Sequence, residues 1–109
     1  MSEIEEITQK LVEFRNERDW QQFHNSKDLA IALAVEANEL LELFLWKQPE
    51  EADNEKIKEE LADVFAFAFL LCEKHNFNVR EIVLDKIKSN HTKYPVSKSK
   101  GSAKKYNEL

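Results

Sequence analysis

Two pairs of acidic residues interrupt the most apolar stretches of this chain. Glu36 and Glu39 lie within LAIALAVEANELLELFLW, and Glu60 and Asp63 lie within EELADVFAFAFLLC. A carboxylate among Leu, Val, Ala and Phe side chains loses hydration, so buried Asp and Glu almost always have a partner or a ligand. Residues three apart share a helix face, so each pair directs two carboxylates the same way. Four converging carboxylates predict a site for a hard divalent cation such as Mg²⁺.

The simpler interpretation places these acids on partly solvated helix edges. Acids form about a fifth of the chain, so roughly four acid-x-x-acid pairs are expected by chance, and Glu3-x-x-Glu6 is interpreted as one of them. The apolar context distinguishes the two central pairs. Seven consecutive apolar residues precede Glu36, and the eight residues after Asp63 are all apolar.

Helices must hold these acids in place, and the composition of the chain predicts such helices. A length of 109 residues indicates one domain. With one Gly and two Pro, tight hairpin turns are scarce, and the abundant Leu, Ala, Glu and Lys favour helix. We expect an all-α four-helix bundle over residues 1–94, followed by a mobile basic tail over residues 95–109.

Local signals set the expected helix ends. Ser2 and Glu5 form a capping box that begins a first helix, which ends near Glu17. A second helix begins at Asn25 or Ser26 and runs to about Trp46, a third covers about 54–74, and a fourth runs from 78 to Tyr94, before Pro95. Asn76 is predicted to cap the third helix in the left-handed conformation.

The short connection that contains Pro49 makes the second and third expected helices antiparallel neighbours. At 1.5 Å per residue, Glu39 and Glu60 lie about 10 and 9 Å from this connection, and Glu36 and Asp63 lie about 15 and 13 Å from it. The two acid pairs therefore come level with each other. This coincidence favours a metal site over two unrelated helix edges.

Charge and composition exclude several classes of protein. Residues 95–109 hold four Lys and one Glu, a charge of +3, which leaves −8 on residues 1–94 and argues against a nucleic-acid-binding body. The single Cys72 cannot form an internal disulfide, so we expect a core residue and a reducing compartment. No signal-peptide pattern or bilayer-length apolar run is present, which predicts a cytoplasmic protein without a membrane partner.

Among metals, Mg²⁺ fits the acids best. Zinc is disfavoured because no Cys or His lies at helical spacing from the carboxylates. A ferritin-like di-iron site would require Glu three residues before a His, and His24, His75 and His91 all lack it. Because Mg²⁺ held by acids commonly serves a phosphate substrate, a phosphate ester or anhydride is the predicted ligand.

Several other side chains suit a nucleotide. Trp20, Phe23 and Trp46 could stack on a base, and packing in a core or an interface is the alternative. His24 and Asn90 could hydrogen-bond the base or sugar, although a surface role is commoner for both types. Four lysines could meet phosphates, with a solvated surface as the alternative: Lys47, Lys93, Lys104 and Lys105.

With these residues the chain resembles the MazG-like all-α nucleoside triphosphate pyrophosphohydrolases, in particular their dCTP pyrophosphatase branch. The family pattern E-x-x-E, spacer, E-x-x-D matches the four acids, and the flanking segments DWQQFH, LFLWK and KYNEL extend the likeness over about Phe14 to Leu109. The resemblance implies cleavage between the α- and β-phosphates, giving a nucleoside monophosphate and pyrophosphate. It implies that the four acids hold Mg²⁺ and that one glutamate orients or deprotonates water.

The resemblance also places substrate contacts. Trp20, His24, Trp46 and Asn90 match positions that contact the nucleoside, and the predicted substrate-binding set further includes Lys47, Lys93, Tyr94, Lys104 and Lys105. The tail is expected to close over the triphosphate. Surplus apolar surface predicts further subunits, and the family implies a homotetramer built as a dimer of dimers.

Two departures from the vertebrate members bear on the substrate. Leu11 stands where those members place a first-helix His near the base, and the spacer between Trp46 and Glu60 is shorter, as in bacterial members. We therefore expect dCTP or related, noncanonical dNTPs instead of strict cytosine selectivity. Two other classes stay open: a non-catalytic helical oligomerisation module with acids along its seam, and a hydrolase of the same fold that acts on another phosphorylated metabolite.

Overall fold

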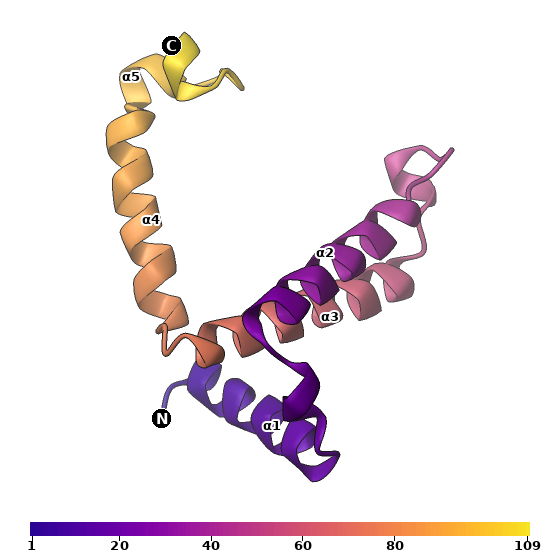
Figure 1. Ribbon diagram of the computed structural model, residues 1–109. Coiled ribbons are helices and arrows are strands. Elements are labelled where there is room, and N and C mark those ends of the chain that lie inside the picture. Colours follow the sequence, from indigo (N-terminus) through magenta and orange to yellow (C-terminus); the bar gives the residue numbers. More distant parts are fainter. The chain divides into compact units, whose positions relative to one another are not determined.

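The computed structural model describes all 109 residues and contains helices but no strand (Figure 1). The all-α prediction is confirmed. The main helices are α1 (Glu3–Glu17), α2 (Ser26–Glu42), α3 (Asn54–Lys74) and α4 (Val79–Lys93). The shorter helical elements are η1 (Trp20–Phe23), η2 (Pro49–Glu51), α5 (Val96–Ser99) and η3 (Tyr106–Glu108). No helix combines the length and the hydropathy that a bilayer span requires.

The chain divides into two compact units, Met1–Phe77 and Asn78–Leu109. In the first unit, α2 and α3 lie side by side and α1 packs on α3 (Figure 1). The best-buried side chains come from the facing sides of the long pair: Leu29 of α2 is fully buried and Leu70 of α3 is 5% exposed. The α2/α3 pair is therefore the scaffold of this unit.

The predicted caps form. The Ser2 hydroxyl accepts from the Glu5 backbone N–H at 3.1 Å, and the Glu5 carboxylate accepts from the Ser2 N–H at 3.0 Å. The Asn25 side chain accepts from the Asp28 N–H and begins α2. Asn76, just after α3, adopts φ 57°, as predicted for a left-handed helix end.

The expected end of α2 was wrong by four residues. The helix ends at Glu42, and residues 43–47 form turns, with Trp46 at φ 60°. The apolar sequence of Leu43 to Trp46 continues the helical pattern, so no side chain signals the stop before Pro49.

The second unit contains α4, α5 and η3, so two short helical elements interrupt the expected tail. Tyr106 of η3 meets Tyr94 edge to face, with ring centroids 6.0 Å apart. The Lys93 ammonium lies 5.1 Å from the centre of the Tyr106 ring, within cation–π range. The end of the chain thus packs against the end of α4.

Candidate metal and substrate site

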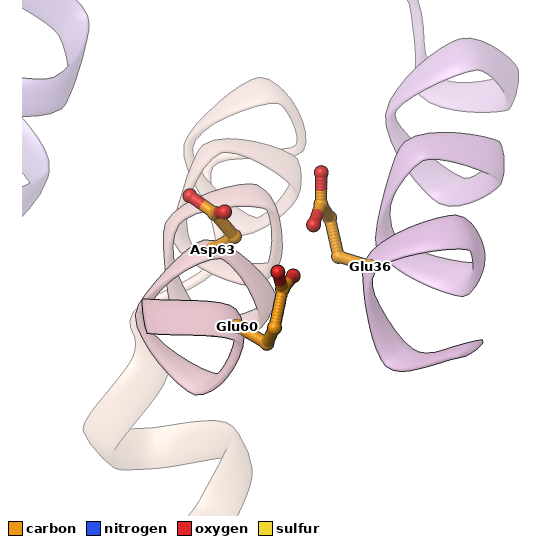
Figure 2. A group of neighbouring side chains, drawn as sticks. All are labelled: Glu36, Glu60 and Asp63. Atoms are coloured by element: carbon orange, nitrogen blue, oxygen red, sulfur yellow. The ribbon is translucent and has the colours of Figure 1, made fainter. Parts of the chain in front are cut away.

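Three acids from two helices converge between α2 and α3. Glu36 of α2 points toward Glu60 and Asp63 of α3 (Figure 2). Each offers a carboxylate oxygen, and these three oxygens lie within 4.8 Å of one another. The side-by-side packing of α2 and α3 produces this group, as the matched distances from their connection predict.

Burial and mutual repulsion disturb the ionisation of this group. Burial, followed by interaction with the Glu39 carboxyl and then with Asp63, raises the pKa of Glu36 to about 7. Burial and the same Glu39 carboxyl raise the pKa of Glu60. Like charges at short range disfavour ionisation because each new negative charge repels those already present.

Glu39 takes a different place from its three partners. It lies close enough to affect Glu36 and Glu60, yet it is outside the group of three and its side chain is exposed. With five other α2 residues it lines an open hollow of about 490 Å³: Ile31, Ala34, Val35, Asn38 and Glu42. Glu39 therefore connects the acid group with the open face of α2.

The group of three suits a divalent cation. Oε2 of Glu36 and Oε2 of Glu60 are both buried without a hydrogen-bond partner. Buried carboxylate oxygens normally have partners, so two orphaned oxygens within one acid group favour a positively charged ligand there. An all-oxygen donor set is the type that Mg²⁺ prefers. The residues present thus fit a metal ion of that class.

Two of the predicted nucleoside contacts lie before α2, in the connection from α1. The ring of Trp20 meets Phe14 of α1 edge to face at 5.9 Å, and 45% of Trp20 stays exposed. His24 meets Phe67 of α3 edge to face at 6.3 Å, and its Nδ1 is buried without a partner. Burial, then the charge of Arg15, lowers the pKa of His24, which favours the neutral imidazole.

Two further predicted contacts lie at the other end of α2. Trp46 and Lys47 occupy the turn that follows the helix, and Trp46 is 94% exposed. The 17 residues of α2 separate them from His24, a length of about 25 Å. One copy of this unit therefore does not bring Trp20 and His24 together with Trp46.

The remaining predicted contacts belong to the second unit. Asn90 and Lys93 lie on α4, Tyr94 follows it, and Lys104 and Lys105 precede η3. Lys93 and Tyr94 both contact the Tyr106 ring, whereas Lys104 and Lys105 are exposed. These five assignments stay predictions.

Sequence reasoning missed the side chains that support the aromatic connection. Arg15 on α1 pairs with Glu73 on α3 at 3.3 Å, and Ser26 lies 2.8 Å from His75. The only sequence signal for a buried role of Arg15 is its position four residues after Leu11, on the apolar side of the helix. The partners Glu73 and His75 lie 58 and 49 residues away, so local patterns do not identify them.

The fold and the acid group define a class: an all-α protein with an acidic metal-type site on a helix pair. Comparison with known proteins agrees. The model of the MazG-like family matches residues 31–109. dCTP pyrophosphatase 1 of Bos taurus is 38% identical over 97% of this chain and 68% of its own length. The Homo sapiens protein of that name is 35% identical over 97% and 67%.

A solved structure supports the same assignment. The crystal structure of a pyrophosphatase from Archaeoglobus fulgidus superposes with a TM-score of 0.81 at 34% identity, covering 87% of this chain and 94% of that one. The family match, the sequence identities and the structural superposition all point to one family. The chain belongs to the MazG-like family.

Proposed function

We propose that this protein hydrolyses deoxynucleoside triphosphates to the monophosphate and pyrophosphate, with dCTP or a related noncanonical dNTP as substrate. The prediction of a nucleoside triphosphate pyrophosphohydrolase is confirmed by the family match and by relatives that are themselves pyrophosphatases. The observation that carries the proposal to this chain is the convergence of Glu36, Glu60 and Asp63 within 4.8 Å.

The four acids would serve two roles, binding the cation and accepting a proton from water. Glu36, Glu60 and Asp63 would hold Mg²⁺ with Glu39 at the open side, and the bound cation would neutralise phosphate charge and activate water. Orientation of the water and acceptance of its proton fall to a carboxylate of this set. Addition of water across the α–β anhydride bond would then give the monophosphate and pyrophosphate.

The nucleoside would meet Trp20 and His24 at one end and Trp46 at the other. The exposed indoles offer faces for stacking on a base. The neutral imidazole of His24 has an Nδ1 without a partner, which suits a hydrogen bond to a base or sugar. The family resemblance assigns Asn90 to the nucleoside, and the charge of Lys47 assigns it to a phosphate.

We propose that the working form is a homotetramer in which two copies share each site. A nucleoside is shorter than the 25 Å or so between His24 and Trp46 of one copy, so a second copy would supply one of the two ends. Apolar side chains about half exposed in both units support association: Ile31, Val35, Phe65, Val83 and Ile87. Exposed apolar surface on this scale marks an interface.

We propose that residues 95–109 act as an arm that brings Lys104 and Lys105 to the outer phosphates. The arm carries +3 in a protein of −5, and lysine ammonium groups serve as point charges for phosphate. Truncation after Pro95 should raise the KM for the triphosphate about 10-fold, with an unchanged midpoint of thermal unfolding for the metal-free protein. Unchanged kinetics on truncation would leave only a solubilising role.

The test of function is a panel of canonical and noncanonical nucleoside triphosphates with Mg²⁺, assayed separately for pyrophosphate and orthophosphate. We expect pyrophosphate in equal amount to the monophosphate, loss of turnover with EDTA, and highest kcat/KM for a cytosine nucleotide or a modified one. Orthophosphate release would indicate a different phosphohydrolase, and no turnover would favour the non-catalytic module. A cytoplasmic location, where nucleotide pools reside, goes with this proposal.

A further inference from the structure

Two side-chain contacts tie the end of α3 to both ends of the α1–α2 connection. At the end of α1, Nη1 of Arg15 lies 3.3 Å from Oε2 of Glu73, and the Arg15 side chain is only 11% exposed. At the start of α2, Oγ of Ser26 lies 2.8 Å from Nε2 of His75. Residues 16–25, which lie between these two contacts (the tethers), are thus held at both ends by the last turn of α3 and the residue that caps it.

The held segment carries the two aromatic groups assigned to the nucleoside. Trp20 rests against Phe14, the neighbour of Arg15 in α1, and His24 rests against Phe67 of α3. The charge of Arg15 also lowers the pKa of His24. The placement of both rings therefore follows from where α1 and the start of α2 sit on α3.

Local packing covers the aromatic side chains of this segment only in part. Asp19 adopts φ 56°, a left-handed conformation that residues with a Cβ rarely adopt, so the chain turns sharply there. Trp20 and Phe23 are 45% and 61% exposed, which leaves each ring covered on part of its surface only. His75 is itself oriented by stacking on Phe77, with ring centroids 5.2 Å apart.

We propose that Glu73 and His75 are positioning residues for the nucleoside end of the site. Through Arg15 and Ser26 they fix the connection that presents Trp20 and His24, and thereby set the affinity for the nucleoside without touching it. This inference rests on the proposed function, in which that connection contacts the substrate. Glu73 lies ten residues after Asp63, about 15 Å along α3, so the tethers act apart from the acid group.

Steady-state kinetics of full-length variants with Mg²⁺ test the proposal. Glu73→Ala and Ser26→Ala each remove one tether, and the double variant removes both. We expect KM for the preferred triphosphate to rise about 3-fold for each and about 10-fold for the double variant, with kcat within about twofold of wild type. The Mg²⁺ activation midpoint should stay unchanged, and Ser26→Thr, which keeps the hydroxyl, should restore KM.

The matched control is Glu55→Ala. It removes an exposed ion pair to Lys58, 3.4 Å long, on the same helix and far from the connection. This variant should keep the wild-type KM. If the double variant matched Glu55→Ala in KM while keeping helical circular dichroism, the proposal would be overturned, as it would by a fall in kcat at constant KM.

A second readout is independent of activity. In a Trp46→Phe background, Trp20 is the sole tryptophan, and its fluorescence anisotropy reports how firmly the connection is held. Loss of either tether should lower this anisotropy, whereas Glu55→Ala should not. If the wild-type protein hydrolysed no triphosphate, the proposed function would be wrong. The anisotropy would still show whether the two contacts hold the connection. If the double variant failed to fold, the single variants would decide.

Discussion

At the scale of single residues, neighbouring glutamates on α2 differ in environment because of helix geometry. Glu36 lies on the face that meets α3, with Leu29, Leu33 and Leu40, and one of its oxygens is buried without a partner. Glu39, three residues later, lies on the open face with Ile31 and Val35. A turn of 100° per residue puts 60° between them, enough to separate a buried ligand from an accessible carboxylate.

Neutralising one acid of the group of three should remove activity while preserving the fold. Glu36→Gln or Asp63→Asn should lower kcat by about 100-fold or more, because a metal ligand is lost. The metal-free variant should unfold at a higher temperature than the metal-free wild type, since one source of repulsion is gone. Isothermal titration with Mg²⁺ and thermal melts in EDTA measure both effects. Near-normal turnover would show that the site is misplaced, and Glu55→Gln, on exposed α3 surface, is the control.

The raised pKa of Glu36 predicts a pH dependence whose sign is fixed. Its folded value of about 7 exceeds the ordinary value of 4.5, so the metal-free folded protein keeps a proton that the unfolded chain releases. Its contribution to stability is therefore full below about pH 4.5 and is lost as pH rises through about 7. Because Mg²⁺ binds the carboxylate, Mg²⁺ affinity should rise over the same interval.

Measurements at two pH values separate this effect from other ionisations. Thermal unfolding in EDTA at pH 5 and pH 8 should show a larger loss of stability in wild type than in Glu36→Gln, which cannot ionise there. An equal change in both proteins would assign the pH dependence to other groups.

At the scale of elements, sequence predicted what local signals encode. The end of α3 was found because Asn76 marks it. The acid group was found because one short connection containing Pro49 follows α2 and precedes α3. The end of α2 was missed because Leu43 to Trp46 are as apolar as the helix before them. The tethers were missed because their partners are distant in sequence, and only folding brings Arg15 to Glu73.

Leu29 should be the most sensitive apolar position of the α2/α3 pair. Its side chain is fully buried, so Leu29→Ala should destabilise the protein by about 2–5 kcal/mol through lost burial and a residual cavity. Urea denaturation at fixed protein concentration measures this cost. Ile31→Ala, on the open face, is the matched control and should weaken association more than folding. A loss below about 1 kcal/mol for Leu29→Ala would contradict the assigned core.

At the scale of the whole molecule, the proposed association of several copies rests on the distribution of apolar and functional groups. Only Leu29 and Leu70 are buried apolar side chains, and large apolar residues on every main helix are exposed. The groups assigned to one nucleoside lie at opposite ends of α2. The proposed association would explain both facts, because it would cover the apolar faces and bring one end of α2 to the other end in a second copy.

This explanation predicts complementation between inactive chains. His24→Ala and Trp46→Ala should each impair turnover because each removes a nucleoside contact. In a mixed dimer, one site would take Trp46 from the first chain and His24 from the second, and so be intact. An equimolar mixture refolded together should regain about a quarter of wild-type activity, since half the dimers are mixed and half their sites are whole. Mixing His24→Ala with Trp20→Ala is the control: both changes lie on one connection, so no site is restored. Verified mixed oligomers without a gain in activity would show that each chain builds its site alone.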